Sequence, residues 1–488
     1  MVIEVNNVYG KIVDKLPIEI LSKIQQQCQF KVEGSEFKSR SFRYRNIKWD
    51  GYKKLFNIQT RRFPIGLLSR IVKLLNDLGM TIDIIDKRVH LDDEYEYEYD
   101  NSFLRPYQHQ AVLAAVVNGN GILKIATGGG KTVIAGCTIG ALKKKSIFIV
   151  HTRDLLYQAK SSFERLFPNE KIGQIGDGII DYQNITVATM QTLAILGRLK
   201  NIDKTKYDDC GTSEKKLTED MIKGANFNRY VVTVQCVMMD EVQIVSSQTA
   251  QEVRFLFTSA DYAFGYSASP WRDDGSDLAI EGAFGTRIID ITASQLIKQG
   301  FLVRPTIEIH QCIYRYLDTS GGTYNDIYRR YVVENPSRNI QVCEDAAAQW
   351  ARGYNTLILV TQIKHGQLLE EILNRFSCPA IFISGKSSMK KRNQAIQDMR
   401  DGKRSIMIAS TIADVGLDIP RLQCIIEAGA GKSSVTALQR LGRIMRPFEG
   451  KNECIFITYK DSAPYICNHI DRKIDIWKNE EEFIIEYK

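Results

Sequence analysis

The sequence predicts an α/β protein in which two doubly wound parallel-sheet lobes follow a small α/β N-terminal domain. From residue 101, short apolar runs such as GILKIA and SIMIA alternate with helical patterns, which is typical of buried parallel strands covered by helices. At 488 residues the chain is also too long for a single core. The strand-like runs fall into two sets, so we expect a first lobe over residues 101–303 and a second over residues 304–460.

Residues 1–91 are expected to form the N-terminal domain. VIEV and KIVDKL predict short strands, and residues 18–27 and 63–80 predict helices, the second ending at Gly79. This segment carries 17 Lys and Arg against 9 Asp and Glu. The basic excess is compatible with binding to a polyanion, although many proteins without such a partner share it.

Three further segments complete the expected organisation. Residues 92–100, DDEYEYEYD, hold six acids and no base. We interpret them as an acidic linker, with a strand edge or an internal mimic of DNA charge as alternatives. Residues 198–224 are polar and weakly periodic, which predicts an insertion on the first lobe, and residues 461–488 are expected to form a C-terminal tail.

The composition argues against several classes of protein. No apolar run approaches the roughly 18 residues that a membrane-spanning helix needs, and MVIEVNNVYG lacks the features of a secretory signal. The ten cysteines contain no C-x-x-C pair and the six histidines have no zinc spacing, so we expect reduced thiols and no structural metal. We therefore expect no membrane partner and a cytoplasmic location.

The segment GILKIATGGGKT (121–132) predicts a phosphate-binding loop. An apolar strand leads into a glycine turn, and Lys131 and Thr132 open a helix. Glycines allow the backbone to wrap phosphates, the lysine supplies a charge for the β- and γ-phosphates, and the threonine supplies a hydroxyl for Mg²⁺. The loop departs from the strict motif because Ile125 stands where the first glycine is expected. The candidate ATP contacts of the turn are Thr127, Gly128, Gly129, Gly130, Lys131 and Thr132.

A second acidic element supports this interpretation. VQCVMMDEVQ (234–243) predicts a strand that delivers Asp240 and Glu241 to its carboxyl end, where ligands bind in open α/β sheets. Asp240 is expected to hold Mg²⁺, partly through water, and Glu241 to polarise the attacking water. Together with Lys131, these residues predict an ATPase.

Over most of residues 101–460 the chain resembles the superfamily-2 helicases and translocases. The resemblance rests on eight segments in the family's order: RPYQHQ (105–110), ATGGGKT (126–132), VHTRDLLYQ (150–158), TVATMQTL (186–193), DEVQ (240–243), YSASP (266–270), ASTIADVGLDIP (409–420) and QRLGRIMRP (439–447).

The resemblance implies two RecA-like lobes, ATP and Mg²⁺ as cofactors, and DNA as partner. It implies that Arg105 and Gln110 lie on the adenine side of the ATP site. Gly416 and Asp418 would contact the nucleotide from the second lobe. Arginines that neutralise the transferring phosphate accelerate phosphoryl transfer by about 10³–10⁵. The last matching segment implies this role for Arg443 and Arg446, with Gln439 beside them.

The resemblance also implies a nucleic-acid strand that crosses both lobes, held by contacts to phosphates that carry no sequence information. Gln243 stands where histidine is commoner, and Ser269 replaces a threonine but keeps the hydroxyl. With Ser267 they are expected to couple hydrolysis to strand binding. The implied strand contacts are Thr152, Arg153, Thr189, Gln191 and Thr192 on the first lobe and Thr361, Ser384, Gly385 and Thr411 on the second.

Finer features favour the repair and recombination branch of this superfamily. Residues 42–68 resemble the N-terminal domain of UvsW-type branched-DNA helicases of phages, whose neighbours include XPB-like and RecG-like enzymes. The expected function is an ATP-dependent DNA helicase or translocase that remodels forks and junctions in replication, recombination or repair. The alternatives are an RNA-dependent ATPase and an ATP-gated DNA clamp without unwinding.

Two further hypotheses concern segments outside the shared motifs. The N-terminal domain is expected to bind duplex or branched DNA through a basic face that includes Lys53, Lys54, Arg61 and Arg62, with packing of its aromatics in a core as the alternative. CIIEAGAGKSS (424–434) also predicts a strand, a glycine turn and Lys-Ser. No acidic partner strand follows it, so we interpret it as a turn rather than a second nucleotide site.

Overall fold

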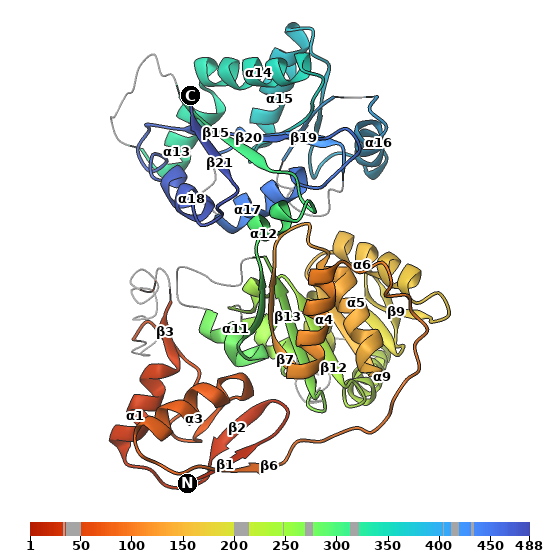
Figure 1. Cartoon of the computed structure of the whole chain (residues 1–488), viewed down its shortest axis with the longest axis vertical. Coiled ribbons are helices and arrows are strands. Elements are labelled where there is room, and N and C mark those ends of the chain that lie inside the picture. The colour runs from red at the N-terminus through yellow and green to blue at the C-terminus, as the bar shows by residue number, and fades with distance from the viewer. Residues whose placement is uncertain are drawn as a thin grey trace. The chain divides into compact units, whose positions relative to one another are not determined.

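The chain forms two compact units in this computed structural model (Figure 1). The first unit holds Met1–Ile125 and Gly130–Asp290, and the second holds Ala126–Gly129 and Ile291–Lys488. None of the described helices is long and apolar enough to cross a lipid bilayer. The structure describes residues 1–32, 35, 50–199, 214–246, 248–268, 277–312, 322–403, 405–410, 419–430 and 434–488.

The N-terminal domain (residues 1–91) belongs to the first unit and has its own apolar core, built around Ile3, Ile24, Phe56, Phe63 and Ile71. The strand predicted over VIEV and the helix over residues 18–27 are confirmed, whereas the strand predicted over KIVDKL (11–16) lies earlier, at Tyr9–Ile12. Its sheet has the order β5-β2-β1-β6, in which β1 pairs antiparallel with β2 and parallel with β6. Its elements are β1 (Val2–Val5), β2 (Tyr9–Ile12), α1 (Ile18–Gln27), β3 (Gln29–Lys31), β4 (Tyr52–Lys54), β5 (Arg62–Pro64), η2 (Ile65–Leu67), α3 (Leu68–Asp77) and β6 (Asp83–Asp86).

The second helix of this domain is shorter than predicted. The prediction placed its start at residue 63, but Arg62–Pro64 pairs with β2, and α3 begins at Leu68. Pro64 has an extended backbone at the end of the strand. The helix then stops at Asp77, two residues before Gly79, whose φ of 77° is the left-handed conformation typical of a helix end.

The remainder of the first unit is an eight-stranded sheet of order β10-β9-β11-β8-β12-β13-β7-β14. The strands from β9 to β7 pair in parallel, so their carboxyl ends share one edge. Figure 1 shows α4 and α5 against strands of this sheet. Its strands are β7 (Asn120–Ile125), β8 (Ser146–Val150), β9 (Ile172–Gly176), β10 (Ile179–Asp181), β11 (Ile185–Thr189), β12 (Cys236–Asp240), β13 (Tyr262–Ser267) and β14 (Arg287–Ile291). Its helices are α4 (Pro106–Asn118), α5 (Lys131–Leu142), α6 (Arg153–Leu166), α7 (Met190–Leu199), α9 (Glu214–Val231), η3 (Val242–Ser246), α10 (Gln248–Arg254) and α11 (Asp277–Phe284).

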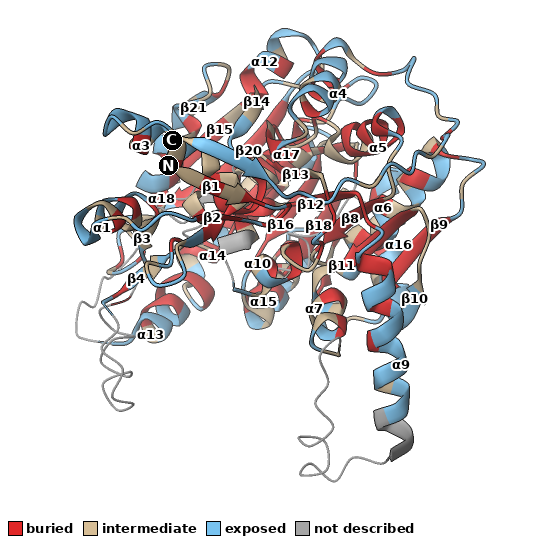
Figure 2. Cartoon of the chain, turned by 90° about the horizontal axis from the view of Figure 1, so that it is seen from below, coloured by how far each residue is buried: buried red, intermediate tan, exposed pale blue. Residues whose placement is uncertain are grey.

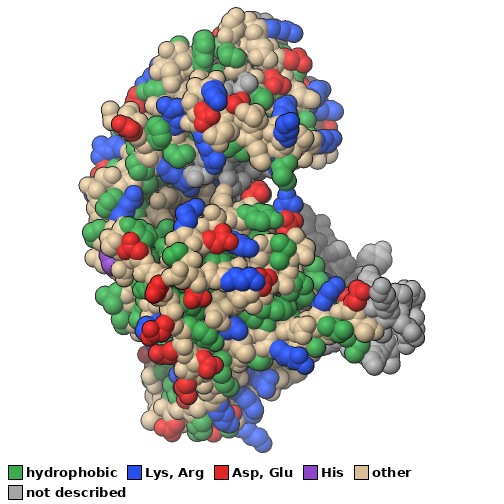
Figure 3. Space-filling model, turned by 90° about the vertical axis from the view of Figure 1, so that its right-hand side faces the viewer, with side chains coloured by type: hydrophobic (Ala, Val, Ile, Leu, Met, Phe, Trp, Pro, Cys, Tyr) green, Lys and Arg blue, Asp and Glu red, His purple; other side chains and the backbone are tan. Residues whose placement is uncertain are grey.

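The acidic tract 92–100 is more than a solvated linker. The ring of Tyr97 is buried against Phe167, and Tyr99 packs on the same phenylalanine. Glu94 and Glu96 form ion pairs with Lys144 and Lys143. The alternating tyrosines therefore fasten the tract to the sheet domain while its acids neutralise nearby lysines. Figure 3 shows acidic and basic side chains interspersed over this side of the first unit.

The segment predicted as an insertion ends within helix α9, and only the part of that helix beyond residue 224 belongs to the core. Residues 200–213 lie outside the described part of the chain, and α9 follows them. Phe227, Tyr230 and Val231 near its carboxyl end are buried in the core of the sheet domain. In Figure 2 the strands β8, β11 and β12 are coloured as buried, whereas α9 exposes much of its length.

The second unit is built on a sheet of order β17-β18-β16-β19-β20-β15-β21, whose described pairs are all parallel. The parallel sheets predicted for both lobes are therefore confirmed. Its strands are β15 (Pro305–Gln311), β16 (Asn355–Leu359), β17 (Ala380–Ile383), β18 (Ile406–Ala409), β19 (Leu422–Glu427), β20 (Cys454–Lys460) and β21 (Ile484–Tyr487). Its helices are α12 (Ala293–Lys298), α13 (Tyr324–Tyr328), the π-helix η4 (Arg329–Val333), α14 (Pro336–Ala351), α15 (Ile363–Arg375), α16 (Met389–Arg400), α17 (Ser434–Ile444) and α18 (His469–Trp477).

Residues 461–488 are part of this unit and not a tail. Trp477 of α18 is fully buried against Phe456, and β21 extends the sheet beside β15. Asp461 forms a buried ion pair with Arg338. The prediction missed this because β21 is a four-residue edge strand in a charged sequence, which gives little periodic signal.

Candidate functional site

The glycine turn and Lys131 lie at the carboxyl edge of the first sheet. The turn follows β7, and Lys131 is the first residue of α5. Gly128 and Gly130 have φ values of 85° and 82°, which only glycine adopts readily. A Cβ on Gly130 would lie 2.5 Å from the side-chain nitrogen of Gln108, so a larger residue would also clash there. The sequence therefore builds a tight turn that leads directly into a helix N-terminus.

Lys131 lies against two carboxylates that the neighbouring strand β12 supplies. Its Nζ donates to Oε1 of Glu241 at 3.0 Å and lies 4.0 Å from Oδ1 of Asp240. Burial raises the pKa of Asp240 to about 6, despite the charge of Lys131. Burial acts the same way on Glu241, but Lys131 and a hydrogen bond from Gln243 outweigh it, so its pKa lies below the ordinary value. The site thus holds one carboxylate that its neighbours keep ionised and one whose burial favours the protonated form.

A chain of hydrogen bonds leads from Glu241 to the next strand. Nε2 of Gln243 donates to Oε2 of Glu241 at 2.7 Å, and the hydroxyl of Ser267 donates to Oε1 of Gln243 at 2.7 Å. Ser267 ends β13, the strand that pairs with β12. Gln243 and Ser267, both predicted as coupling residues, are therefore brought together with Glu241. Ser269, the third predicted coupling residue, lies outside the described residues.

The structure distinguishes between the two glutamines of RPYQHQ. Gln108 is buried and its side chain contacts Gly130, whereas Gln110 is exposed. Arg105 caps α4 and its backbone N–H donates to Oε1 of Gln108 at 3.0 Å. Residues two positions apart on a helix point in nearly opposite directions, so only one of the glutamines can face the turn. The geometry favours Gln108, and the prediction of Gln110 reflected its position in the motif rather than its place on the helix.

The residues of the turn fit a magnesium nucleotide. Within the described part of the chain, the buried hydroxyl of Thr127 has no hydrogen-bond partner, and Thr127 packs against Gly442. Thr132 is the second residue of α5, next to Lys131, and its hydroxyl type suits Mg²⁺. Asp240 supplies a carboxylate oxygen, the ligand that Mg²⁺ prefers. Gly129 completes the glycine turn between Gly128 and Gly130.

The predicted strand contacts of the first lobe occupy the other half of the same sheet edge. Thr189 ends β11 and pairs with Val150 at the end of β8. Its hydroxyl lies 2.9 Å from that of Thr192, and Gln191 between them is exposed. Thr152 caps α6 by accepting from the N–H of Leu155. Arg153, at the start of α6, forms an exposed ion pair with Asp177.

The second unit positions its predicted arginines on α17. All three predicted residues are partly exposed: Gln439 in the middle of that helix, Arg443 near its end, and Arg446 two residues past it. Arg440 between them is buried and binds Glu427, which also accepts from Lys473, so it anchors the helix. Gly416 and Asp418 lie outside the described residues.

A buried lysine that the sequence did not reveal fixes the end of this helix. Nζ of Lys451 donates to the carbonyl oxygens of Leu422 and Arg446 at 2.6 and 2.9 Å. Burial lowers its pKa to about 8. Lys451 thereby ties the backbone at Arg446 to strand β19. Its only sequence signal is its place four residues past the last motif, which carries no chemistry by itself.

The predicted strand contacts of the second unit also follow parallel strands. Thr361 follows β16, and Tyr328 contacts its hydroxyl. Ser384 and Gly385 follow β17, and the hydroxyl of Ser384 accepts from the N–H of Lys386. Thr411 lies outside the described residues. So do Lys432 and Ser433 of the second glycine turn, whose preceding strand is β19.

Two of the four basic residues predicted on the N-terminal domain border a groove of about 570 Å³. Lys53 and Lys54 line it from β4, and Arg198 of α7 lines it from the sheet domain. Lys54 is paired with Asp50, and burial lowers the pKa of Lys53. Arg61 donates to a backbone carbonyl and Arg62 is exposed on β5. The aromatic and basic residues 38–49 lie outside the described part of the chain.

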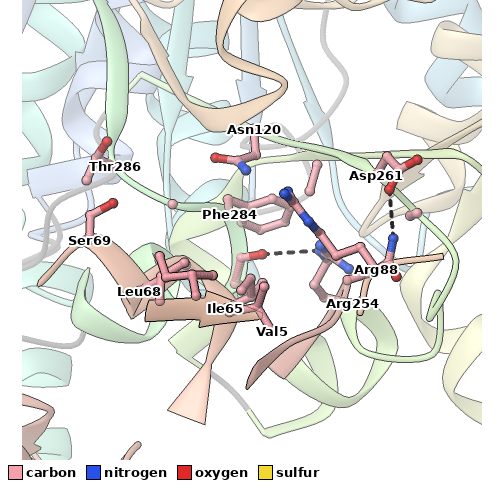
Figure 4. A pocket seen from close by; sticks show the side chains of 17 residues that line it. Val5, Ile65, Leu68, Ser69, Arg88, Asn120, Arg254, Asp261, Phe284 and Thr286 are labelled. Atoms are coloured by element: carbon pink, nitrogen blue, oxygen red, sulfur yellow. Dashed lines mark hydrogen bonds between the residues drawn. The ribbon is translucent and has the colours of Figure 1, made fainter. Parts of the chain in front are cut away.

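The N-terminal domain is fastened to the sheet domain by charged and polar contacts. Arg70 donates two hydrogen bonds to Glu281, at 3.2 and 2.6 Å. Asn7 donates to Asp261 at 2.8 Å. Figure 4 shows a neighbouring cavity of about 230 Å³ to which both domains contribute side chains. The labelled residues are Val5, Ile65, Leu68, Ser69 and Arg88 from the N-terminal domain and Asn120, Arg254, Asp261, Phe284 and Thr286 from the sheet domain.

Comparison with known families now adds to this geometry. Residues 101–272 match the family described as the res subunit of type III restriction enzymes, and residues 338–447 match the helicase conserved C-terminal domain. The two matches follow one another along the two sheets described above. The chain belongs to the superfamily-2 helicases. It is therefore an ATP-hydrolysing helicase by family, with RecA-like lobes, as the sequence predicted.

Individual relatives agree with this assignment. The ATP-dependent DNA helicase uvsW of Enterobacteria phage T4 is 24% identical over 467 residues, which cover 89% of this chain and 85% of that protein. The DNA 3'-5' translocase XPB2 of Sulfurisphaera tokodaii is 24% identical over 401 residues, 75% of this chain and 84% of that protein. A solved fragment named as an HsdR subunit of a type I restriction enzyme from Vibrio vulnificus shares the fold, with a TM-score of 0.56, 16% identity and coverage of 93% of this chain and 82% of that one.

Proposed function

We propose that this helicase is a DNA-stimulated ATPase that translocates on duplex or branched DNA and remodels forks and junctions. The observation that carries the proposal is the buried chain from Lys131 through Glu241 and Gln243 to Ser267. It links the residue types needed for hydrolysis to the next strand of the sheet. The name of the phage relative, an ATP-dependent DNA helicase, and the coverage of both chains support DNA as the substrate.

In this proposal each residue has a distinct task. Lys131 binds the β- and γ-phosphates, and Glu241 takes the proton of the attacking water. Bound Mg²⁺ neutralises the charge that develops on the phosphates. Asp240 and Thr132 hold the metal, partly through water. Gln108, instead of Gln110, lies on the adenine side beside Arg105.

Arg443 and Arg446 are proposed to stabilise the transferring phosphate, with Gln439 on the same helix. Replacing either arginine by alanine should reduce the turnover number far more than the affinity for ATP, because the charge is needed mainly in the transition state. Arg440→Ala should instead destabilise the second unit, since it leaves Glu427 buried with one cation fewer. Steady-state ATPase assays and nucleotide binding separate the two outcomes. Arginine variants that lose ATP binding but keep the maximal rate would contradict the role.

The N-terminal domain is proposed to read the branch point. Lys53 and Lys54 border the groove that also touches α7, the helix that begins after Thr189. Substituting Lys53, Lys54, Arg61 and Arg62 together should weaken junction binding and reduce the slope of affinity against salt, because fewer counterions are released. Junction binding with an unchanged slope would exclude this role.

One comparison tests the proposed function directly. ATPase rates are measured with single-stranded DNA, duplex, a fork, a four-way junction and RNA. We expect stimulation by DNA that is largest with forks or junctions. Stimulation by RNA alone would support the RNA-dependent alternative. DNA-stimulated turnover without translocation or strand displacement would support the clamp.

A further inference from the structure

An aromatic cluster lies at the carboxyl edge of the second sheet. Tyr324 and Tyr328 are one turn apart on α13, and their rings stack with centroids 6.0 Å apart and planes inclined by 28°. The ring of His469 on α18 lies 6.2 Å from that of Tyr324. Tyr328 is almost fully buried, whereas Tyr324 is 43% exposed. The cluster therefore presents one solvent-facing aromatic ring on a buried aromatic support.

Both supporting rings are tied to the ends of neighbouring strands. The hydroxyl of Tyr328 contacts the hydroxyl of Thr361, which follows β16. A ring nitrogen of His469 lies 3.3 Å from the carbonyl oxygen of Ala430, which follows β19. Strands β16 and β19 pair in parallel. The contacts of Tyr328 and His469 therefore lie at the same edge of the sheet, the edge that carries Thr361. Tyr324 is thus held beside a residue proposed to contact a nucleic-acid strand.

The backbone beneath the exposed ring is fixed. Thr323 caps α13 in a reciprocal arrangement with Asp326, so the helix begins at Tyr324. Tyr328 packs in a small core with Tyr331, Val332 and Ile466. A ring that is already ordered loses little conformational entropy when a flat ligand stacks on it.

Two cations, each paired with a carboxylate, lie on elements next to this cluster. Lys364 on the first turn of α15 and Arg329 after α13 are both exposed cations. Their partners, Glu334 and Asp326, are also surface residues, so these pairs are weak and solvent-screened. The phosphates of a nucleic-acid strand can replace the carboxylates as partners of these cations, and its unpaired bases can stack on an aromatic ring.

We propose that Tyr324 is a base-stacking residue for a single nucleic-acid strand that crosses the carboxyl edge of the second sheet. This inference rests on the proposed function, because it needs a strand at Thr361. Tyr324 would contact a base of the strand, whereas the residues of the shared motifs are expected to contact its phosphates. Stacking is tolerant of sequence, since every base has a flat face.

The test compares two single DNA strands of equal length, one ordinary and one with abasic sites throughout. Binding is measured on the whole protein for the parent, Tyr324→Ala, Tyr324→Leu and Tyr324→Phe. Tyr324→Ala and Tyr324→Leu should weaken binding of the ordinary strand by about 5- to 100-fold, the scale of one stacked base, and should leave the abasic strand unaffected. Tyr324→Phe should retain binding, because it keeps the ring.

Phe376→Ala is the matched control. Phe376 is 40% exposed in the same unit but follows the carboxyl end of α15, at the opposite edge from Thr361. It should change neither affinity. Equal losses on both strands, or no loss on either, would overturn the stacking role of Tyr324. Failure of the parent to bind any DNA strand and to show DNA-stimulated hydrolysis would overturn the proposed function itself, and with it this inference.

Discussion

Replacing Glu241 by glutamine should stop hydrolysis while leaving the fold and the nucleotide site intact. The substitution keeps the size of the side chain but removes its charge. Among its contacts with described residues, Glu241 accepts hydrogen bonds from Lys131 and Gln243, whereas a glutamine offers only one oxygen. The hydrogen-bond network around this residue can rearrange. The new amide can keep its oxygen toward Lys131, Gln243 can flip its amide, and the hydroxyl of Ser267 can then accept instead of donate.

The magnitudes of the two effects differ widely. In the variant, Lys131 donates to a neutral amide oxygen instead of a charged carboxylate, which weakens the network by about 1 kcal/mol. The rearrangement of Gln243 and Ser267 adds nothing to this loss, because every hydrogen bond is kept. Loss of the general base lowers the rate of hydrolysis by a factor of about 10²–10⁴, which corresponds to roughly 3–5 kcal/mol of transition-state stabilisation. Turnover should therefore fall by at least two orders of magnitude while ATP and DNA affinities stay within a few-fold of the parent.

The assay is DNA-stimulated phosphate release, with nucleotide and DNA binding measured on the same preparation. Glu252→Gln is a matched control, because Glu252 also accepts from a glutamine, Gln248, at 2.7 Å, but lies exposed on α10. It should hydrolyse ATP like the parent. Hydrolysis by Glu241→Gln within ten-fold of the parent would refute the assignment of the general base. Loss of ATP binding would refute the proposed rearrangement.

Three further outcomes follow from the same geometry. Lys131→Ala should abolish turnover and raise the pKa of its carboxylate neighbours, with circular dichroism unchanged; near-normal DNA-stimulated hydrolysis would contradict the phosphate contact. Because burial raises the pKa of Asp240 to about 6, protons should compete with Mg²⁺, so the Mg²⁺ concentration for half-maximal activity should rise as pH falls from 7 to 5. A Mg²⁺ requirement that is flat over this range would contradict that assignment. Gly66→Ala should loosen the N-terminal domain, since a Cβ there would lie 2.0 Å from the carbonyl oxygen of Glu281. Faster limited proteolysis near residues 87–100 measures this loosening, and Gly322→Ala, where the nearest atom is 3.4 Å away, should show none.

The parallel strands were predictable because their residues form continuous apolar runs. The runs SIFIV and SIMIA, for example, became β8 and β18, since a strand buried on both faces has no polar side to dilute the signal. The order of phosphate loop and DE pair likewise placed Lys131, Asp240 and Glu241 at one sheet edge. These features depend on local sequence and on the geometry common to all parallel sheets.

Other features depend on contacts between distant segments, which no local pattern encodes. The tyrosines of residues 92–100 pack because Phe167 lies beside them, and β21 is a strand because β15 offers it an edge. The choice between Gln108 and Gln110 required the start of α4, because two residues along a helix reverse the direction of a side chain. The contact of His469 with Tyr324 was visible only once α18 lay next to α13.

The arrangement of the first unit also suggests how its parts influence one another. Helix α11 packs against η2 of the N-terminal domain on one side and against η3, which carries Gln243, on the other. Gly66 of η2 lies so close to α11 that no side chain fits between them, and Gly265 of β13 allows a similar approach of Val242. A shift of the N-terminal domain on DNA would therefore move α11, and a shift of α11 would press on the residue that holds Glu241. Such a shift would reach Gln243, whose amide donates to Glu241, because packed interiors transmit strain. The same contacts that fasten the N-terminal domain thus provide a physical route from the proposed branch reader to the base of the hydrolysis reaction.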